Sequence, residues 1–257
     1  MDKLPPSEKF FDVSDYSRPF SRHLVKLVIN TSLTPIFFTT ISLISGILAA
    51  ILIYLNKFNF IIAILILLKS FFDAVDGELA RARNRPSYVG RFYDSVVDFF
   101  VNVLIFLSLA IRFEISAVKL IVVIILFHLQ GSIYNYYYVL KRHKAGGDKT
   151  SRIDERKIDQ IYPYDNPFWF KVFHTLYVWI YSWQDLIIHK IDSDAENLAN
   201  IPNSFMTLTS FLGLGTQLLL ISIFTLFSLE KYIVDFFIYF YSLLAIGVIL
   251  IRKIFYH

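Results

Sequence analysis

The sequence predicts an all-α integral membrane protein with six transmembrane helices, an N-terminal amphipathic helix at the membrane interface, and a cytoplasmic insert between the fourth and fifth helices. Two observations predict this fold class. Of the 257 residues, 56% are hydrophobic and 18% are aromatic, which makes the chain far more apolar than a soluble domain. The apolar residues are also grouped in runs close to the length of about 20 residues that crosses a bilayer. Because unpaired backbone is too costly in hydrocarbon, and the strand alternation of a barrel is not seen, these runs should be helices.

Six apolar segments define the expected organisation of the chain. They cover residues 35–56, 58–80, 91–111, 117–140, 204–228 and 232–251. Four regions follow: a cytoplasmic N-terminus with the interfacial helix (1–34), the first four spans (35–140), a cytoplasmic or interfacial insert (141–203), and the last two spans with a short C-terminal tail (204–257).

Two segments outside the spans have the pattern of helices that lie on a membrane surface. Residues 16–30 mix basic and apolar positions at helical spacing, and Pro35 then opens the first span. Residues 167–191 are rich in aromatic side chains but are interrupted by Lys171, His174, Gln184 and Asp185. We therefore expect the second segment to lie in the headgroup region rather than to cross the bilayer.

Lysine and arginine residues are distributed unevenly between the two sides of this topology. One side carries Arg18, Arg22, Lys26, Arg81, Arg83, Arg85, Arg91, the basic residues between 141 and 157, Arg252 and Lys253, whereas the other carries Lys57, Arg112, Lys119 and Lys231. Since cytoplasmic loops are enriched in basic residues, both termini and the loop between the second and third spans should face the cytoplasm. The net charge is only +4 and the basic residues stand between apolar runs, which argues against a nucleic-acid partner.

Four aspartates stand where the second and third apolar segments approach each other, in the stretch FFDAVDGELARARNRPSYVGRFYDSVVDFF. Asp73 and Asp76 are three residues apart and Asp94 and Asp98 are four apart, so each pair lies on one face of its helix. The short connection between them, which contains Pro86, should join the helices as an antiparallel pair. The four carboxylates are therefore expected to converge in one pocket near the membrane surface.

Such a cluster would repel itself unless cations neutralised it. The chain has no cysteine, so metal ligands must be oxygen or nitrogen atoms. Mg²⁺ and Mn²⁺ prefer oxygen ligands and bind through a few carboxylates together with substrate phosphates. Small residues on the same faces (Gly77, Ala80 and Gly90) leave room for a bulky ligand. The guanidinium of Arg81 can donate two parallel hydrogen bonds to a phosphate. One aspartate at a helix end is often only a cap, but four at helical spacing favour a functional site.

The residues from Asp73 to Asp98 read D-x2-D-G-x2-A-R-x8-G-x3-D-x3-D, and in this motif the chain resembles the CDP-alcohol phosphotransferase (CDP-alcohol phosphatidyltransferase) family. The resemblance covers residues 20–140 best, and the insert 141–203 has no counterpart that can be aligned by eye in the smallest members. It implies an enzyme of phospholipid biosynthesis that transfers a substituted phosphate from a CDP-linked donor to the hydroxyl of an acceptor alcohol and releases CMP. It also implies a homodimer surrounded by membrane lipids.

The resemblance also implies roles for individual residues. Asp73, Asp76, Asp94 and Asp98 would hold two Mg²⁺ or Mn²⁺ ions, and Asp98 would also act as the general base. The CDP pocket would be lined by Asp76, Gly77, Ala80, Arg81 and Gly90.

The first span departs from the family pattern. Many relatives open it with Pro-Asn-x-x-Thr, whereas this chain keeps Pro35 and Thr39 but has Ile36 in place of the asparagine. Thr39 is expected to reach the diphosphate of the donor.

The motif does not specify which donor or which acceptor is used. CDP-diacylglycerol is the favoured donor, and the alternative is a choline- or ethanolamine-type phosphotransferase that joins a CDP-headgroup donor to diacylglycerol. The candidate acceptor-binding residues follow the fourth span, at Lys141, Arg142, Lys149 and Arg152. This basic run beside several tyrosines is also typical of a membrane anchor on the cytoplasmic side.

Two other classes of membrane protein agree less well with the sequence. An intramembrane prenyltransferase also binds Mg²⁺ and a diphosphate through aspartates, but it needs a second aspartate motif, and the second half of the chain offers only Asp235 in an apolar span. A transporter should show broken helices or paired polar sites near the midplane, and neither is clear in the fifth and sixth spans. A non-enzymatic transporter or scaffold remains the alternative from another class.

Overall fold

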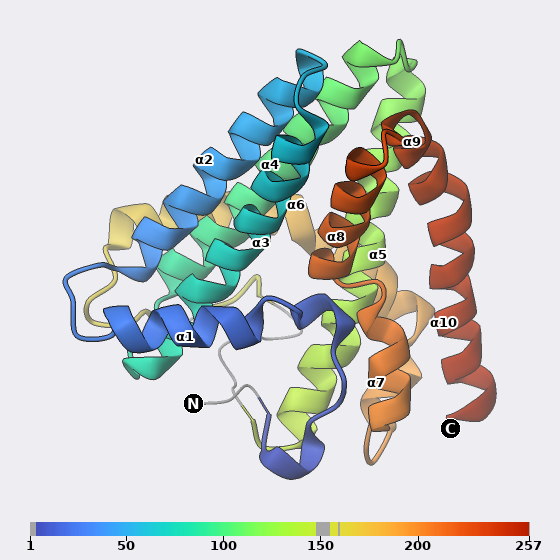
Figure 1. Cartoon of the computed structure of the whole chain (residues 1–257). Helices are drawn as coiled ribbons and strands as arrows, with labels where there is room; N and C mark the ends of the chain where they lie inside the picture. Colours follow the sequence, from blue (N-terminus) through green and yellow to red (C-terminus); the bar gives the residue numbers. More distant parts are fainter. Residues whose placement is uncertain (1–3, 148–154, 159, 257) are drawn as a thin grey trace.

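The computed structural model describes residues 4–147, 155–158 and 160–256, and in these ranges its regular secondary structure is helical, without a strand. The helices are α1 (Arg18–Val28), α2 (Pro35–Tyr54), α3 (Asn59–Ala82), α4 (Tyr88–Arg112), α5 (Ala117–Lys144), α6 (Pro167–Ile191), α7 (Asn203–Ser210), α8 (Leu214–Leu226), α9 (Ile233–Asp235) and α10 (Tyr241–Phe255) (Figure 1). A π-helical turn, Phe236–Phe240, joins α9 to α10. The expected all-α fold class is confirmed.

Several of the described helices are long and apolar enough to cross a membrane. These are α2, α4, α5 and the run Glu230–Phe255, and the bent pair of α7 and α8 makes a fifth if it is one span. The protein is therefore a multi-pass membrane protein. The second predicted span, α3, does not belong to this set, because Lys69, Asp73 and Asp76 interrupt its apolar surface.

Four of the described α-helices begin at a residue whose side chain caps the helix N-terminus. The hydroxyls of Thr34, Ser87 and Ser116 accept hydrogen bonds from backbone N–H groups three residues later and so cap α2, α4 and α5. Asn166 caps α6, whose bounds coincide with the predicted interfacial segment. At its other end α5 continues to Lys144, so the basic residues expected in the insert begin on the helix itself.

The fifth and sixth spans, in which the sequence shows no clear break, are both interrupted in the structure. The fifth is bent by 40° between α7 and α8, and the last contains the π-helical turn. The bend lies where the N-terminal segment crosses: a Cβ on Gly215 would stand 1.8 Å from the carbonyl oxygen of Ser14, and one on Gly213 would stand 2.5 Å from the Cβ of Ser14. The glycines of the LGLG sequence therefore admit this segment against the break.

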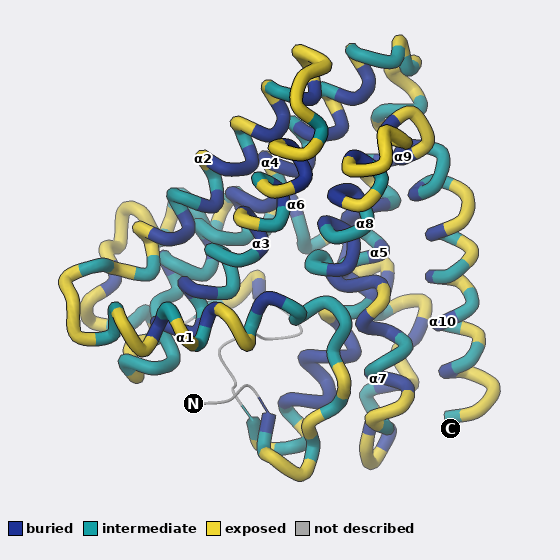
Figure 2. Tube along the Cα trace, viewed as in Figure 1, coloured by how far each residue is buried: buried dark blue, intermediate teal, exposed yellow. Residues whose placement is uncertain are grey.

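The helices form a bundle in which α3 occupies a central position, with α2 and α8 packed against it and α4 packed against α2 (Figure 1). The buried residues lie on the inward faces of the helices, whereas outward faces carry exposed positions (Figure 2). Exposed apolar side chains such as Leu48, Leu243 and Leu250 belong to these outward faces, as expected for contact with lipid.

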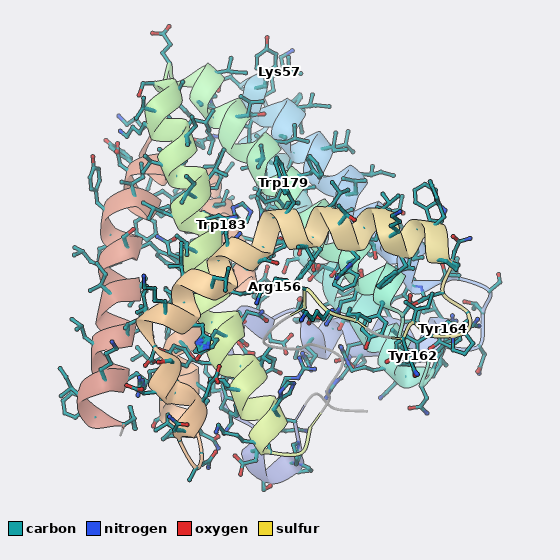
Figure 3. All side chains as sticks on the ribbon, turned by 180° about the vertical axis from the view of Figure 1, so that it is seen from behind. Lys57, Arg156, Tyr162, Tyr164, Trp179 and Trp183 are labelled. Carbon is teal, nitrogen blue, oxygen red and sulfur yellow. The ribbon has the colours of Figure 1, made fainter. Side chains whose placement is uncertain are left out.

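Two helices run across the bundle on opposite sides. α1 packs against α3 and buries Val25 with Phe38, Val75 and Leu79. α6 packs against α4 and α5 on the other side, and Figure 3 shows it running across the spans. Trp179 on α6 is 83% exposed, and the location of this helix in the headgroup region stays a prediction.

Arg83 fastens α1 to the beginning of α2. Its guanidinium donates hydrogen bonds to the backbone carbonyls of Val28, Ile29, Thr31 and Leu33, at distances of 2.7–3.0 Å. These carbonyls belong to the C-terminal end of α1 and to the turn that follows, where a helix has no partners of its own.

Replacing Arg83 with Gln should lower the thermal stability of the purified protein in detergent. The change removes a charged donor of several hydrogen bonds, which we expect to cost about 2 kcal/mol. The matched control is Lys26→Gln on α1, because Lys26 is exposed and its substitution should leave the unfolding temperature unchanged. Equal unfolding temperatures for the two variants would contradict the proposed role of Arg83.

Candidate active site

A cavity of about 1080 Å³ lies at the centre of the bundle and is bordered by the N-terminal segment, the beginning of α2, α3, α4, α5, α6 and α8. This volume is slightly above the range that is usual for small-molecule sites, about 300–1,000 Å³. The cavity begins beside the turn between α3 and α4 and continues inward past Asp98 to Asn102 and Gln217. It therefore has space for two substrates.

The four aspartates of the motif all line this cavity. Asp73, Asp94 and Asp98 each offer a carboxylate oxygen within 4.8 Å of the others. Asp76 is buried and accepts a hydrogen bond of 2.5 Å from the hydroxyl of Thr39. The convergence expected from the spacing along the two helices is what the structure has.

This donor set fits a hard divalent cation. The Oδ1 atoms of Asp73 and Asp94 are buried and have no hydrogen-bond partner. Buried carboxylate oxygens without partners are costly, and a divalent cation satisfies them with the oxygen ligation that Mg²⁺ and Mn²⁺ prefer. The residues present are therefore suited to the metal ions that the sequence motif implies.

The predicted nucleotide-binding residues lie around the same cavity. Thr39, Gly77, Ala80, Arg81 and Gly90 all line it. The absence of a side chain at Gly77 lets Arg81 fold back along α3, because a Cβ there would stand 3.2 Å from both terminal guanidinium nitrogens of Arg81. Arg81 also contacts Glu78 at 3.1 Å, so its guanidinium is held at the edge of the cavity.

The candidate acceptor-binding residues do not all lie together. Arg142 lines the cavity. Lys141 does not: it is fully buried, and its Nζ lies 2.8 Å from Glu8 Oε2 and 2.8 Å from the carbonyl oxygen of Ile201. Lys149 and Arg152 lie outside the described residues.

Sequence analysis missed Lys69. This residue is fully buried on α3, one turn before Asp73, and its ammonium group forms an ion pair with Asp98. A lysine in an apolar run at the i−4 position from Asp73 is a signal that could have been used, since both side chains then share a helix face. Lys69 supplies a positive charge inside the aspartate cluster, which sequence analysis assigned to metal ions alone.

The insert also contributes to the site, which the motif did not indicate. Asp165 accepts hydrogen bonds from Ser87 Oγ at 2.6 Å and from the backbone N–H of Tyr88 at 2.8 Å, at the start of α4. The carboxylate of Glu155 accepts two hydrogen bonds of 2.7 Å from Arg91, beside Gly90. The insert thus holds the end of α4 that carries Asp94.

Tyr164 and α6 add further contacts to this end of the site. The Tyr164 hydroxyl donates a hydrogen bond to the carbonyl oxygen of Pro86. Figure 3 shows Tyr162 and Tyr164 on the segment that precedes α6. Tyr181 on α6 donates its hydroxyl to the carbonyl of Ser95 at 2.9 Å. Burial, and then the nearby charge of Asp98, raise the pKa of Tyr181 well above its usual value, so this hydroxyl stays a donor.

Comparison with known families agrees with this geometry. A family model described as CDP-alcohol phosphatidyltransferase matches residues 32–164, more than half of the 257 residues. The matched range contains α2 to α5 and therefore all four aspartates. A comparison with curated proteins gave no match.

Replacing Lys69 with Met should destabilise the metal-free protein. Removing one partner of a buried ion pair leaves Asp98 uncompensated, which typically costs about 3–5 kcal/mol. Because a divalent cation can neutralise the same cluster, Mn²⁺ should raise the unfolding temperature of the variant more than that of the unmodified protein.

The matched control is Lys141→Met, which removes another fully buried lysine from an ion pair, here with Glu8 and away from the aspartates. This variant should also lose stability, but Mn²⁺ should raise its unfolding temperature only as much as that of the unmodified protein. An equal response of both variants to Mn²⁺ would show that Lys69 does not share the charge of the metal site.

Proposed function

The chain belongs to the CDP-alcohol phosphatidyltransferase family, and from this premise we propose that it transfers a substituted phosphate group from a CDP-linked donor, with CDP-diacylglycerol favoured, to the hydroxyl of an acceptor alcohol. The observation that carries this proposal is the convergence of four motif aspartates in one cavity, where two buried carboxylate oxygens have no partner. The reaction belongs to phospholipid biosynthesis.

Asp73, Asp76, Asp94 and Asp98 are the residues that would hold two Mg²⁺ or Mn²⁺ ions. When bound, the ions supply positive charge for the donor diphosphate and for the leaving phosphate. Thr39 holds the carboxylate of Asp76 by its hydrogen bond, and this contact orients Asp76 toward its neighbours.

Asp98 is proposed as the general base. It accepts the proton of the acceptor hydroxyl while that oxygen bonds to the phosphorus, and the bond from phosphorus to the oxygen of CMP breaks. Lys69 contacts Oδ1 of Asp98 and thereby fixes the orientation of the carboxylate. Lys69 is thus a positioning residue in this proposal.

The outer part of the cavity suits the nucleotide and its diphosphate. Gly77, Ala80 and Gly90 leave space beside the backbone, and Arg81 presents donors that match phosphate oxygens. Arg142, a candidate acceptor contact in the sequence, lines the outer part of the cavity from α5.

We further propose six membrane spans, with α3 as the second and the bent pair of α7 and α8 as the fifth. The close packing of α3 against α2 and α8 supports this count, because charged residues that face the interior of a bundle are compatible with a span. The distribution of basic residues supports cytoplasmic termini and a cytoplasmic site. Membership of the family supports a homodimer.

Release of CMP by the purified protein in nanodiscs tests the reaction. With Mn²⁺ and CDP-diacylglycerol, we expect release that depends on an added alcohol, since the alcohol supplies the attacking oxygen. Addition of a chelator should abolish release, and Mn²⁺ or Mg²⁺ should restore it. Release with CDP-choline or CDP-ethanolamine and diacylglycerol, but not with CDP-diacylglycerol, would contradict the proposed donor. Full release in chelator would contradict the proposed metal site.

Replacing Asp98 with Asn should slow turnover while the protein still binds the CDP donor. Loss of a general base typically costs about 10²–10⁴-fold in rate, whereas the groups proposed to hold the nucleotide remain in place. Single-turnover CMP release and equilibrium binding of the donor measure the two effects separately. The control is Asp235→Asn, because Asp235 pairs with Lys119 away from the cavity. Loss of donor binding in the Asp98 variant would show that Asp98 acts mainly as a ligand.

A further inference from the structure

The cavity continues beyond Asp98 into a part that the mechanism above does not use. This inner chamber lies between α4, α5 and α8 and is lined by Asn102, Phe127, His128, Gln217 and Leu218. Its polar side chains carry no charge, in contrast to the arginines of the outer cavity. Polar side chains at this depth in a membrane helix bundle usually have a function.

Asn102 faces α5 from the position one turn after Asp98. On the same side of α4, the ring of Phe99 lies 4.7 Å from that of His128, and the ring of Phe106 lies 5.0 Å from that of Phe127. Asn102 stands between these two contacts in the sequence and is 2% exposed, and its Oδ1 has no hydrogen-bond partner. The atom is therefore a buried acceptor that lacks a donor.

His128 offers a second acceptor of the same kind. Its Nδ1 lies 2.8 Å from the carbonyl oxygen of Ile124, a contact that requires Nδ1 to carry the hydrogen. Nε2 of the neutral ring is then an acceptor, and it is buried without a partner in a side chain that is 7% exposed. Buried polar atoms are normally hydrogen-bonded, so both acceptors are available to the hydroxyl donors of a ligand.

Gln130 shows that an unpartnered atom alone is not sufficient. Its Oε1 is also buried without a partner, but Gln130 does not line the cavity, and its Nε2 donates to the carbonyl of Phe237 at 2.9 Å. It therefore has a structural role beside the π-helical turn. Only an unpartnered acceptor that also borders the cavity can receive a donor from a substrate.

We propose that the inner chamber is the acceptor subsite and takes an uncharged polyol. The polyol donates one hydroxyl to Asn102 Oδ1 and another to His128 Nε2, and presents a third to Asp98, which takes its proton as the oxygen bonds to the phosphorus. Diacylglycerol has a single hydroxyl, which the reaction consumes, so it cannot satisfy both acceptors. This inference rests on the proposed function, and it agrees with CDP-diacylglycerol as the donor.

The test compares Asn102→Leu and His128→Phe, which remove the two acceptors and keep similar side-chain shapes, with the control Gln130→Leu. Glycerol and myo-inositol serve as polyol probes. With saturating CDP-diacylglycerol and Mn²⁺, each cavity variant should raise the KM for the preferred polyol roughly tenfold, as expected for loss of one hydrogen bond. The KM for the donor should stay unchanged, and Gln130→Leu should leave both KM values unchanged.

Equilibrium dialysis of the labelled polyols against the unmodified protein and its variants gives a readout that does not need turnover. Weaker polyol binding in the cavity variants, with Mn²⁺ binding intact, supports the subsite even if no CMP is released by the unmodified protein, in which case only the proposed reaction fails. Equal polyol binding or equal acceptor KM across all variants overturns the subsite. A rise in KM for diacylglycerol as large as that for a polyol overturns the assignment of a polyol.

The variant His128→Gln distinguishes the loss of a hydrogen bond from a folding defect. Glutamine keeps an acceptor oxygen near the position of Nε2, so this variant should retain most of the affinity that His128→Phe loses. An equal loss of polyol affinity in both His128 variants, with unfolding temperatures equal to that of the unmodified protein, contradicts hydrogen bonding at this position.

Discussion

The need to neutralise carboxylates buried between α3 and α4 determines much of this structure. Asp73, Asp76, Asp94 and Asp98 converge in one cavity inside the helix bundle, where isolated negative charges are strongly unfavourable. Lys69 supplies one positive charge from within the bundle, and the unpartnered oxygens show that this charge does not satisfy the cluster. In the proposed metal site, bound cations would supply the remaining compensation, so the affinity for metal ions and the stability of the helix pair would have the same origin.

The segments outside the spans hold this helix pair in place. Hydrogen bonds of Arg83 connect the end of α3 to the turn that follows α1. Hydrogen bonds to Asp165 and Glu155 of the insert fix the start of α4. Geometry at a metal site requires ligands that are fixed by surrounding contacts, and free helix ends would not provide them. The insert is therefore part of the framework of the site, although its sequence shows no catalytic motif.

Features with a local cause could be predicted from the sequence. The pairs of aspartates share a helix face because their spacing is set within one helix, and the bounds of α6 follow from its own composition. The bend between α7 and α8 could not be predicted, because it depends on contact with Ser14, far away in the sequence. The role of Lys69 likewise depends on Asp98 of another helix.

The two halves of the cavity differ in the charge of their polar side chains. In the outer half, arginines and carboxylates suit charged groups, and in the inner half Asn102 and His128 are neutral acceptors. Asn102 and His128 lie in apolar runs whose average composition conceals them, so only the packed structure shows that both residues border one cavity and carry an unpartnered acceptor. Each half leaves buried atoms without partners in the free protein, at some loss of stability. Such a loss is expected where ligands complete the site, because binding then gains the hydrogen bonds and ion contacts that folding leaves unmade.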